Sequence, residues 1–190
     1  MRIGLLGGSF DPPHTGHLLV ASDAFEALAL DCLVFIPAST QPLKAGRAIG
    51  TPEQRLAMVR LLIGDDRRFD VDAIEIDRGG LSYTVDTLTT LAARWPSAEL
   101  FWLVGADVPR LFASWRSPDR IVELATVVVL QRAGETPDLA SMPGRPRCLT
   151  TRRIEISSIE IRYRVRQGKS IRGFVPDAVA AYIDAERLYR

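Results

Sequence analysis

Residues 2–17 read RIGLLGGSFDPPHTGH, an apolar run followed by paired glycines and then by two histidines three positions apart. The apolar run predicts a buried strand that ends in a glycine turn at Gly7-Gly8. Apolar residues at helical spacing follow from about Thr15 to Leu28 and predict a helix. Glycines at a strand end let the backbone approach a ligand, and a helix start offers free N–H groups to phosphate. This stretch therefore predicts a strand–turn–helix unit suited to a phosphorylated ligand.

The same alternation continues along the chain. Further strands are expected at 32–37, within 69–76, and at 100–105, 126–131 and 148–150, and further helices at 51–63, 84–95, from 117, at 158–167 and at 176–187. Strands that alternate with helices predict an α/β fold, a Rossmann-like doubly wound parallel sheet. In such a sheet the ligand lies beyond the carboxyl ends of the strands, where the strand order reverses. The length of 190 residues fits one domain with a small helical part at about 155–190.

Composition restricts the class of protein. The chain is 47% hydrophobic and 25% charged with a net charge of +1, which is typical of an ordinary globular protein without a general attraction for nucleic acid. Its two cysteines are far apart and fit neither a disulfide framework nor a zinc motif. No apolar run approaches membrane-spanning length and residues 1–6 do not resemble a signal peptide, so we expect a cytoplasmic protein without membrane contact. An arginine-rich stretch at 145–172 leaves an RNA-binding module as a distant alternative.

His14 and His17 are the only histidines in the chain, and their spacing places them on one face of the predicted helix start. One interpretation is a satisfied polar pair that only supports the fold. A second is a zinc site, which needs a third ligand of clear spacing that the sequence does not provide, so we expect no protein-bound metal. The third places both side chains beside the predicted phosphate cradle, and we favour it.

A second constellation, ISSIEIR, occupies residues 156–162. Ser157 is placed to cap a helix, with Glu160 three residues on completing a capping box. That pattern alone is equally typical of a routine helix start. The functional interpretation is a second phosphate-binding helix N-terminus with Arg162 directed at the anion.

Together these segments resemble a known family. The first is similar to the (H/T)xGH signature of the nucleotidyltransferase superfamily, and more fully to the GGxFDPxHxGH segment of bacterial nicotinate-nucleotide adenylyltransferases. The second resembles their ISSTxIR motif, with Ile159 at the usual threonine position. The resemblance implies that His17 acts on the α-phosphate of ATP and that His14 assists on the phosphates. Both would stabilise charge without forming a covalent intermediate.

The resemblance extends over essentially the whole chain. Residues 82–88, SYTVDTL, resemble the segment that meets the pyridine nucleotide, and residues 105–107 resemble a GxD motif whose acid takes the ATP ribose hydroxyls. Trp115 resembles a tryptophan that stacks on the nicotinate ring. The implied ATP-binding residues are Gly7, Gly8, Ser9, Phe10, Lys44, Gly105, Asp107, Ser157, Ser158 and Arg162. The implied mononucleotide-binding residues are Gly8, Ser9, Tyr83, Thr84, Trp115 and Arg116.

The activity implied by the resemblance is transfer of AMP from ATP to nicotinate mononucleotide, giving deamido-NAD and pyrophosphate, with Mg²⁺ bound to ATP. Nicotinamide mononucleotide or another phosphorylated acceptor such as phosphopantetheine is the alternative substrate. A nucleotide sensor on the same fold is the alternative without catalysis. Lys44 falls in a segment, 38–50, that is rich in Ser, Thr, Pro and Gly and predicts a mobile loop. The sequence leaves a homo-oligomer open.

Overall fold

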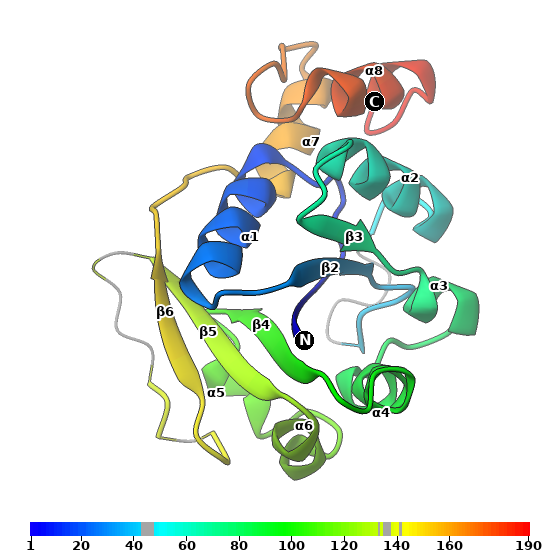
Figure 1. Cartoon of the computed structure of the whole chain (residues 1–190). Helices are drawn as coiled ribbons and strands as arrows, with labels where there is room; N and C mark the ends of the chain where they lie inside the picture. The colour runs from blue at the N-terminus through cyan, green and yellow to red at the C-terminus, as the bar shows by residue number, and fades with distance from the viewer. Residues whose placement is uncertain (43–47, 133, 135–137, 141) are drawn as a thin grey trace.

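The computed structural model describes residues 1–42, 48–132, 134, 138–140 and 142–190. Figure 1 shows a central sheet with helices on both faces and α7 and α8 at one end. The strands are β1 (Arg2–Gly8), β2 (Cys32–Pro37), β3 (Phe69–Val71), β4 (Glu99–Gly105), β5 (Thr126–Arg132) and β6 (Arg147–Thr151). The helices are α1 (Thr15–Ala27), α2 (Pro52–Ile63), α3 (Ile74–Arg78), α4 (Thr84–Arg94), α5 (Pro109–Phe112), α6 (Pro118–Leu124), α7 (Ser158–Arg166) and α8 (Asp177–Ala185).

All strand pairs of the sheet are parallel, and the order is β3-β2-β1-β4-β5-β6. The chain adds β2 and β3 on one side of β1 and then returns to add β4, β5 and β6 on the other side. The strand order therefore reverses between β1 and β4, and in sheets of this kind ligands bind at the carboxyl ends of the strands beside such a switch point. The expected doubly wound α/β sheet is confirmed.

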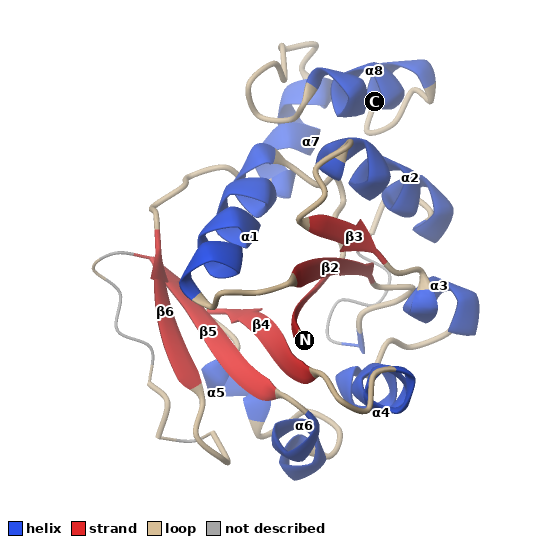
Figure 2. Ribbon diagram, viewed as in Figure 1, coloured by secondary structure: helices blue, strands red, loops and turns tan. Residues whose placement is uncertain are grey.

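Helices cover both faces of the sheet (Figure 2). Apolar side chains of alternate strand positions fill two cores, one on each face. One core joins the strands to α1, α2, α7 and α8, with Met58 and Val179 fully buried. The other joins them to α4, α5 and α6, with Leu88 and Phe112 fully buried. Because both faces are covered, the strands are continuous apolar runs, as buried parallel strands require.

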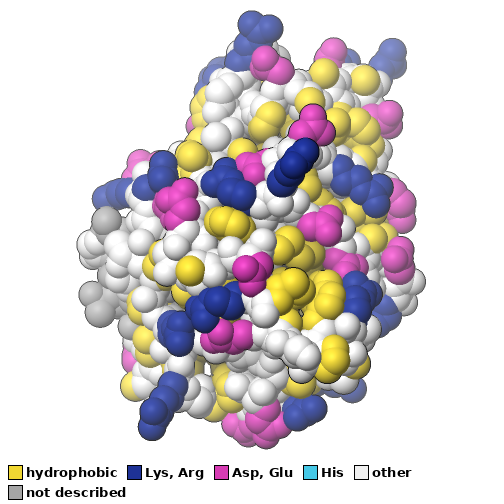
Figure 3. Space-filling model, in the orientation of Figure 1, with side chains coloured by type: hydrophobic (Ala, Val, Ile, Leu, Met, Phe, Trp, Pro, Cys, Tyr) yellow, Lys and Arg dark blue, Asp and Glu magenta, His cyan; other side chains and the backbone are white. Residues whose placement is uncertain are grey.

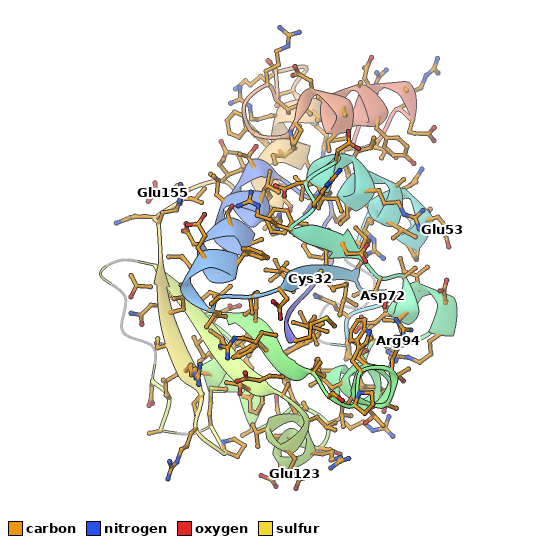
Figure 4. All side chains as sticks on the ribbon, in the orientation of Figure 1. Cys32, Glu53, Asp72, Arg94, Glu123 and Glu155 are labelled. Atoms are coloured by element: carbon orange, nitrogen blue, oxygen red, sulfur yellow. The ribbon has the colours of Figure 1, made fainter. Side chains whose placement is uncertain are left out.

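Local signals explain where α2 begins. Thr51 Oγ1 accepts a hydrogen bond from the Gln54 amide (3.3 Å), and the Gln54 side chain accepts one from the Thr51 amide (2.9 Å). The predicted capping box is therefore present, with Pro52 at the first helical position. Figure 4 labels Asp72 and Arg94, whose ion pair ties the turn before α3 to the end of α4.

The structure corrects three expectations. One or two short strands were expected within 69–76 and one is present as β3 (Phe69–Val71), but Ile74–Arg78 forms α3, a helix that was not expected. The short α5 was not expected, because Pro109–Phe112 offers too few residues for a helical period to be visible. Ser157 caps α7, but among the hydrogen bonds of the described residues the Glu160 carboxylate does not return the bond to the Ser157 amide.

Candidate active site

The end of β1 and the start of α1 bring the two histidines into contact. His14 is the N-cap residue of α1, and its ring stacks on the ring of His17 with a centroid distance of 3.7 Å and an interplanar angle of 29°. The Phe10 ring packs edge-on against His17 at 5.1 Å. Phe10 is itself buried, so its side chain belongs to the core and only its backbone remains available to ATP. Its ring holds the His17 imidazole in place.

One hydrogen bond sets the tautomer of His17. The His14 backbone N–H donates to His17 Nδ1 at 3.1 Å. A neutral imidazole that accepts at Nδ1 carries its proton on Nε2. His17 Nε2 is therefore a hydrogen-bond donor that the helix start does not use, as a group that stabilises negative charge on a phosphate requires.

Both histidines are neutral in the unliganded protein at pH 7. Burial lowers the pKa of His14 from 6.5 to about 4. Burial also holds the pKa of His17 well below 6.5, and repulsion from a protonated His14 at stacking distance lowers it further. Protonation of the pair is therefore disfavoured until a polyanion enters beside it.

These low values predict a loss of stability in mild acid. Between pH 6.5 and about 4 the unfolded chain takes up a proton at His14 that the folded protein does not bind. Folding stability therefore falls as pH falls through that range, by up to about 3 kcal/mol for His14 alone. We expect the decrease in thermal midpoint from pH 7 to pH 4 to be smaller in His14→Gln than in the parent. Identical decreases would contradict a neutral, buried His14.

Gly16 lies between the two histidines for a steric reason. A Cβ added at Gly16 would lie 2.9 Å from His14 Nδ1 and 3.1 Å from its Cε1. His14 is only 7% exposed and stacked on His17, so its ring would have to leave its position. Glycine is therefore required for the stacked pair.

Gly16→Ala is expected to lower kcat about 10²-fold, because a shift of about 1 Å in a positioned group has an effect of that size. Alanine is the better helix former, so the thermal midpoint should change little. Steady-state kinetics beside thermal unfolding tests this prediction. Parent-like kcat in Gly16→Ala would show that catalysis does not require the observed position of the His14 ring.

The start of α7 is fastened to the same loop that carries the histidines. Ser158 Oγ donates to the Pro12 carbonyl (2.8 Å), and Arg162 Nη1 donates to the Asp11 carbonyl (2.6 Å). Ser157 Oγ accepts from the Glu160 amide (3.1 Å) and so caps the helix. The second motif therefore meets the first directly, although about 140 residues separate them.

Arg162 retains unused donor capacity. Its Nε is buried and has no hydrogen-bond partner within the described part of the chain. Its side chain is 16% exposed, so a phosphate can still reach the guanidinium. Ile159, at the usual threonine position, is 72% exposed and contributes no hydroxyl, which leaves the backbone N–H groups of this helix start for an anion.

The segment after β4 carries Asp107, the acid expected to meet the ATP ribose. Gly105 ends the strand, and Asp107 lies two residues further on, exposed to solvent. A Cβ at Gly105 would lie 2.7 Å from Asp107 Oδ1, so the carboxylate lies against the glycine backbone. β1 and β4 are paired parallel strands, so Asp107 follows the carboxyl end of the strand next to the one that carries Gly7 and Gly8.

The residues expected to meet the mononucleotide gather at the start of α4. Ser82 joins this segment to the end of β2: its Oγ accepts from the Ser39 amide (3.0 Å), and its amide donates to the Thr40 carbonyl (2.8 Å). Tyr83 is the N-cap residue of α4 and Thr84 its first residue. The Thr84 N–H is therefore one of those that a helix start leaves without an intrahelical partner.

Two further residues come from the loop between α5 and α6. The Arg116 guanidinium lies 4.9 Å from the centre of the Tyr83 ring and 3.5 Å from the Asp86 carboxylate. Trp115 is half-buried and packs on Phe112 with a centroid distance of 5.2 Å. The structure thus brings Arg116 and Tyr83 together, while Trp115 rests on the core in the absence of ligand. Lys44 lies outside the described residues.

Three buried polar residues in and around the loop between β1 and α1 were not expected as part of the site. Asp11 is 5% exposed, Tyr189 is 4% exposed and bonds to it, and Arg55 is 1% exposed. Arg55 donates to the carbonyls of Ser9 and Ser39, the residues that follow β1 and β2. A signal for Arg55 was present, since it shares the i, i+3, i+4, i+7 stripe of α2 with the buried Met58, Val59 and Leu62.

Neither a metal cluster nor a membrane span is found among the described residues. Within the described ranges, no group of three or more His, Cys, Asp or Glu side chains is arranged to hold a metal ion. Among the same residues no helix is both long and apolar enough to cross a bilayer.

Comparison with known proteins gives a consistent result. The model of the cytidylyltransferase-like family matches residues 5–164. A protein of Gemmatimonas aurantiaca named "Probable nicotinate-nucleotide adenylyltransferase" is 51% identical, over 100% of this chain and 93% of its own length. A Thermus thermophilus protein of the same name is 45% identical over 100% of both chains.

Solved structures agree on the fold. A Plasmodium falciparum nicotinic acid mononucleotide adenylyltransferase complexed with NaAD superimposes with a TM-score of 0.80 at 18% identity, over 99% of this chain and 97% of that one. A Vibrio parahaemolyticus protein named "Putative Nicotinate-nucleotide Adenylyltransferase" superimposes with a TM-score of 0.71 at 22% identity, over 100% of this chain and 95% of that one. With the family model and the full-length relatives, these results identify the chain as a member of the cytidylyltransferase-like family and, within it, of the nicotinate-nucleotide adenylyltransferases.

Proposed function

We propose that this protein transfers AMP from ATP to nicotinate mononucleotide, releasing pyrophosphate and forming nicotinate adenine dinucleotide. The observation that carries the proposal is the joining of two anion-binding helix starts on one loop. Ser158 and Arg162 bond to the carbonyls of Pro12 and Asp11, two and three residues before His14. Two helix N-termini, an arginine and an imidazole N–H therefore come from segments that contact one another, and we infer that together they bind a triphosphate.

ATP is proposed to lie across the switch point of the sheet. Its phosphates meet the backbone of Gly7 to Phe10, the His14–His17 pair, Ser157, Ser158 and Arg162, and its ribose meets Gly105 and Asp107. A carboxylate suits this last role because it accepts hydrogen bonds from two adjacent hydroxyls. Lys44 is proposed as a further phosphate ligand. Mg²⁺ is proposed to enter as the complex with ATP.

The mononucleotide is proposed to lie against the start of α4, with its backbone contacts from Gly8 and Ser9. Tyr83 and Thr84 line one side, and the Trp115 ring stacks on the pyridinium, a cation–π contact of about 0.5–2 kcal/mol. Backbone N–H groups near Thr84 and Arg116 take the nicotinate carboxylate. The Arg116 side chain, placed over Tyr83, adds positive charge on the side where the acid and the amide differ.

The chemical step follows from this arrangement. A phosphate oxygen of the mononucleotide forms a bond to the α-phosphorus of ATP while the bond from that phosphorus to the α–β bridging oxygen breaks, and pyrophosphate leaves with that electron pair. The nucleophile needs no general base, since a phosphate monoester is largely ionised near pH 7. His17 Nε2–H donates to the oxygens that gain charge, and Arg162 neutralises the leaving group.

We also propose a domain organisation, a cellular location and partners for this activity. We infer one domain over residues 1–190, in which the helical part from about 155 supplies Arg162. Two distant free cysteines suit the reducing cytoplasm. The proposed partners are small molecules and not nucleic acid; on the face seen in Figure 3, charges of both signs are interspersed. A homo-oligomer is compatible with all of these features.

Labelled ATP tests the reaction type. With Mg-ATP labelled at the α- or the γ-phosphate and nicotinate mononucleotide as acceptor, the α-label should appear in the dinucleotide and the γ-label in pyrophosphate, in equal amounts. Label released as AMP or inorganic phosphate without a dinucleotide would indicate hydrolysis and contradict the proposal. Transfer to phosphopantetheine alone would retain the chemistry and replace the acceptor.

A further inference from the structure

The carboxylate of Asp11 is the centre of a buried network beside the proposed phosphate site. Its Oδ1 accepts from the Tyr189 hydroxyl (2.7 Å) and the Gly50 amide (3.0 Å), and its Oδ2 accepts from the Ile49 amide (2.8 Å). Arg162 Nη1 lies 3.9 Å from Oδ2 and donates to the Asp11 carbonyl. One residue therefore connects the histidine loop, the end of the segment before α2, the arginine of α7 and the residues after α8.

Tyr189 reaches Asp11 by an unusual backbone path. Arg187 and Tyr189 have positive φ angles of 51° and 64°, which non-glycine residues adopt rarely and at a cost. The turn places Leu188 and Tyr189 in the core against α2 and α8, with the Leu188 amide bonded to the Ile183 carbonyl (3.0 Å). Packing explains the buried ring, but not why its hydroxyl points at the carboxylate next to Arg162.

The hydroxyl is held in its protonated form. Burial, the Asp11 charge and the hydrogen bond to Asp11 all raise the pKa of Tyr189. The hydroxyl therefore donates to Asp11 Oδ1 throughout the physiological pH range. Arg55 supports the same network, because its Nε donates to the carbonyl of Gly50 at 3.2 Å, and the Gly50 amide donates to Asp11 Oδ1.

We propose that Asp11 and Tyr189 are positioning residues for adenylyl transfer. With three donors on its carboxylate, Asp11 holds Arg162 only in a long ion pair. The guanidinium stays 3.9 Å away and is free to meet the triphosphate. Removing the tyrosine hydroxyl leaves a buried carboxylate short of one donor, which draws Arg162 into a direct ion pair and away from ATP. The inference rests on the proposed function in taking ATP as the ligand of Arg162.

Tyr189→Phe is the direct test, because it removes the hydroxyl and keeps the buried ring. We expect the Kd for Mg-ATP and the KM for ATP to rise about tenfold, with the KM for nicotinate mononucleotide within about twofold of the parent. Tyr182→Phe, on α8 and also packed against this core, is the matched control and should leave both constants unchanged.

A double-mutant cycle separates positioning from a general structural effect. If Tyr189 acts through Arg162, Tyr189→Phe should change the ATP constants by less than about twofold in an Arg162→Ala background. Asp11→Asn keeps an acceptor for Tyr189 but removes the charge that would draw Arg162 away, so Tyr189→Phe should also change the ATP constants by less than about twofold in an Asp11→Asn background. All variants are compared at a temperature where thermal unfolding shows each of them folded.

The outcomes are distinct. A tenfold effect of Tyr189→Phe that disappears without Arg162 supports the inference. Equal effects in both backgrounds, or no effect at all, would overturn it. Because the cycle is also measured as ATP affinity by calorimetry, it keeps its meaning if nicotinate mononucleotide is not turned over. Absence of turnover with nicotinate mononucleotide would instead count against the proposed function.

Discussion

His17→Ala is expected to lower kcat by about 10²–10³-fold while the protein stays folded and still binds the mononucleotide. An effect of this size is typical when one preorganised donor to a developing negative charge is removed. His17 Nδ1 accepts from the His14 amide, so Nε2 is the donor that the substitution removes. Single-turnover measurements of the chemical step, with circular dichroism as a check of folding, test the prediction. Near-normal turnover would refute the catalytic role.

His17→Gln is the control that separates catalysis from helix capping. Glutamine at the third helical position can still accept the His14 N–H, as in an ordinary capping box. The thermal midpoint of His17→Gln should therefore stay closer to the parent than that of His17→Ala. Its kcat should nevertheless be low, because the amide does not place a donor where the imidazole Nε2 lies. Restored activity in His17→Gln would reduce His17 to a capping residue.

Arg162→Ala is expected to lower kcat/KM for ATP by about 10–150-fold, the equivalent of the 1.5–3 kcal/mol that a hydrogen bond to a charged group contributes. The guanidinium is mostly buried, fixed on the Asp11 carbonyl and unpaired at Nε among the described residues, so it is ready to bind an anion. Arg162→Lys should rescue little, because an ammonium does not reproduce the planar donor set.

Arg166→Ala is the matched control, one turn further along α7 and exposed to solvent. Its kcat/KM for ATP should equal that of the parent at physiological ionic strength. Equal losses in Arg162→Ala and Arg166→Ala would attribute ATP binding to the general positive charge of this helix. The KM for nicotinate mononucleotide, measured in both variants, should not change.

Most of the fold could be predicted because its signals are local. The apolar runs of β1, β2 and β4 and the capping box before α2 each lie within a few residues. The alternation of strands and helices then permits few topologies. The helix Ile74–Arg78 was not predicted, because five residues show little more than one turn of periodicity.

The candidate site was predictable where a motif is continuous in sequence. His14, His17, Ser157 and Arg162 stand in such motifs, and the structure joins them on one loop. Their roles as ligands remain predictions. Lys44 lies outside the described residues, and the Phe10 ring proved to be core.

The network around Asp11 could not be predicted, because it depends on long-range contacts. Tyr189 meets Asp11 across 178 positions, and Arg55 meets Ser9 across 46. Nothing local marks a tyrosine near the last residues as a partner of the phosphate loop. The buried stripe of α2 gave a hint for Arg55, but a long polar side chain on such a stripe more often bends out to solvent.

The measurement that tests the central claim most directly is turnover with the two pyridine mononucleotides in parallel. The purified protein, with Mg-ATP and either nicotinate or nicotinamide mononucleotide, is assayed for pyrophosphate together with the dinucleotide product. We predict equimolar products with kcat/KM clearly higher for the acid, because the N–H groups at the start of α4 and the Arg116 charge favour a carboxylate. Turnover of the amide alone would contradict the substrate assignment, and no dinucleotide from either would contradict the account.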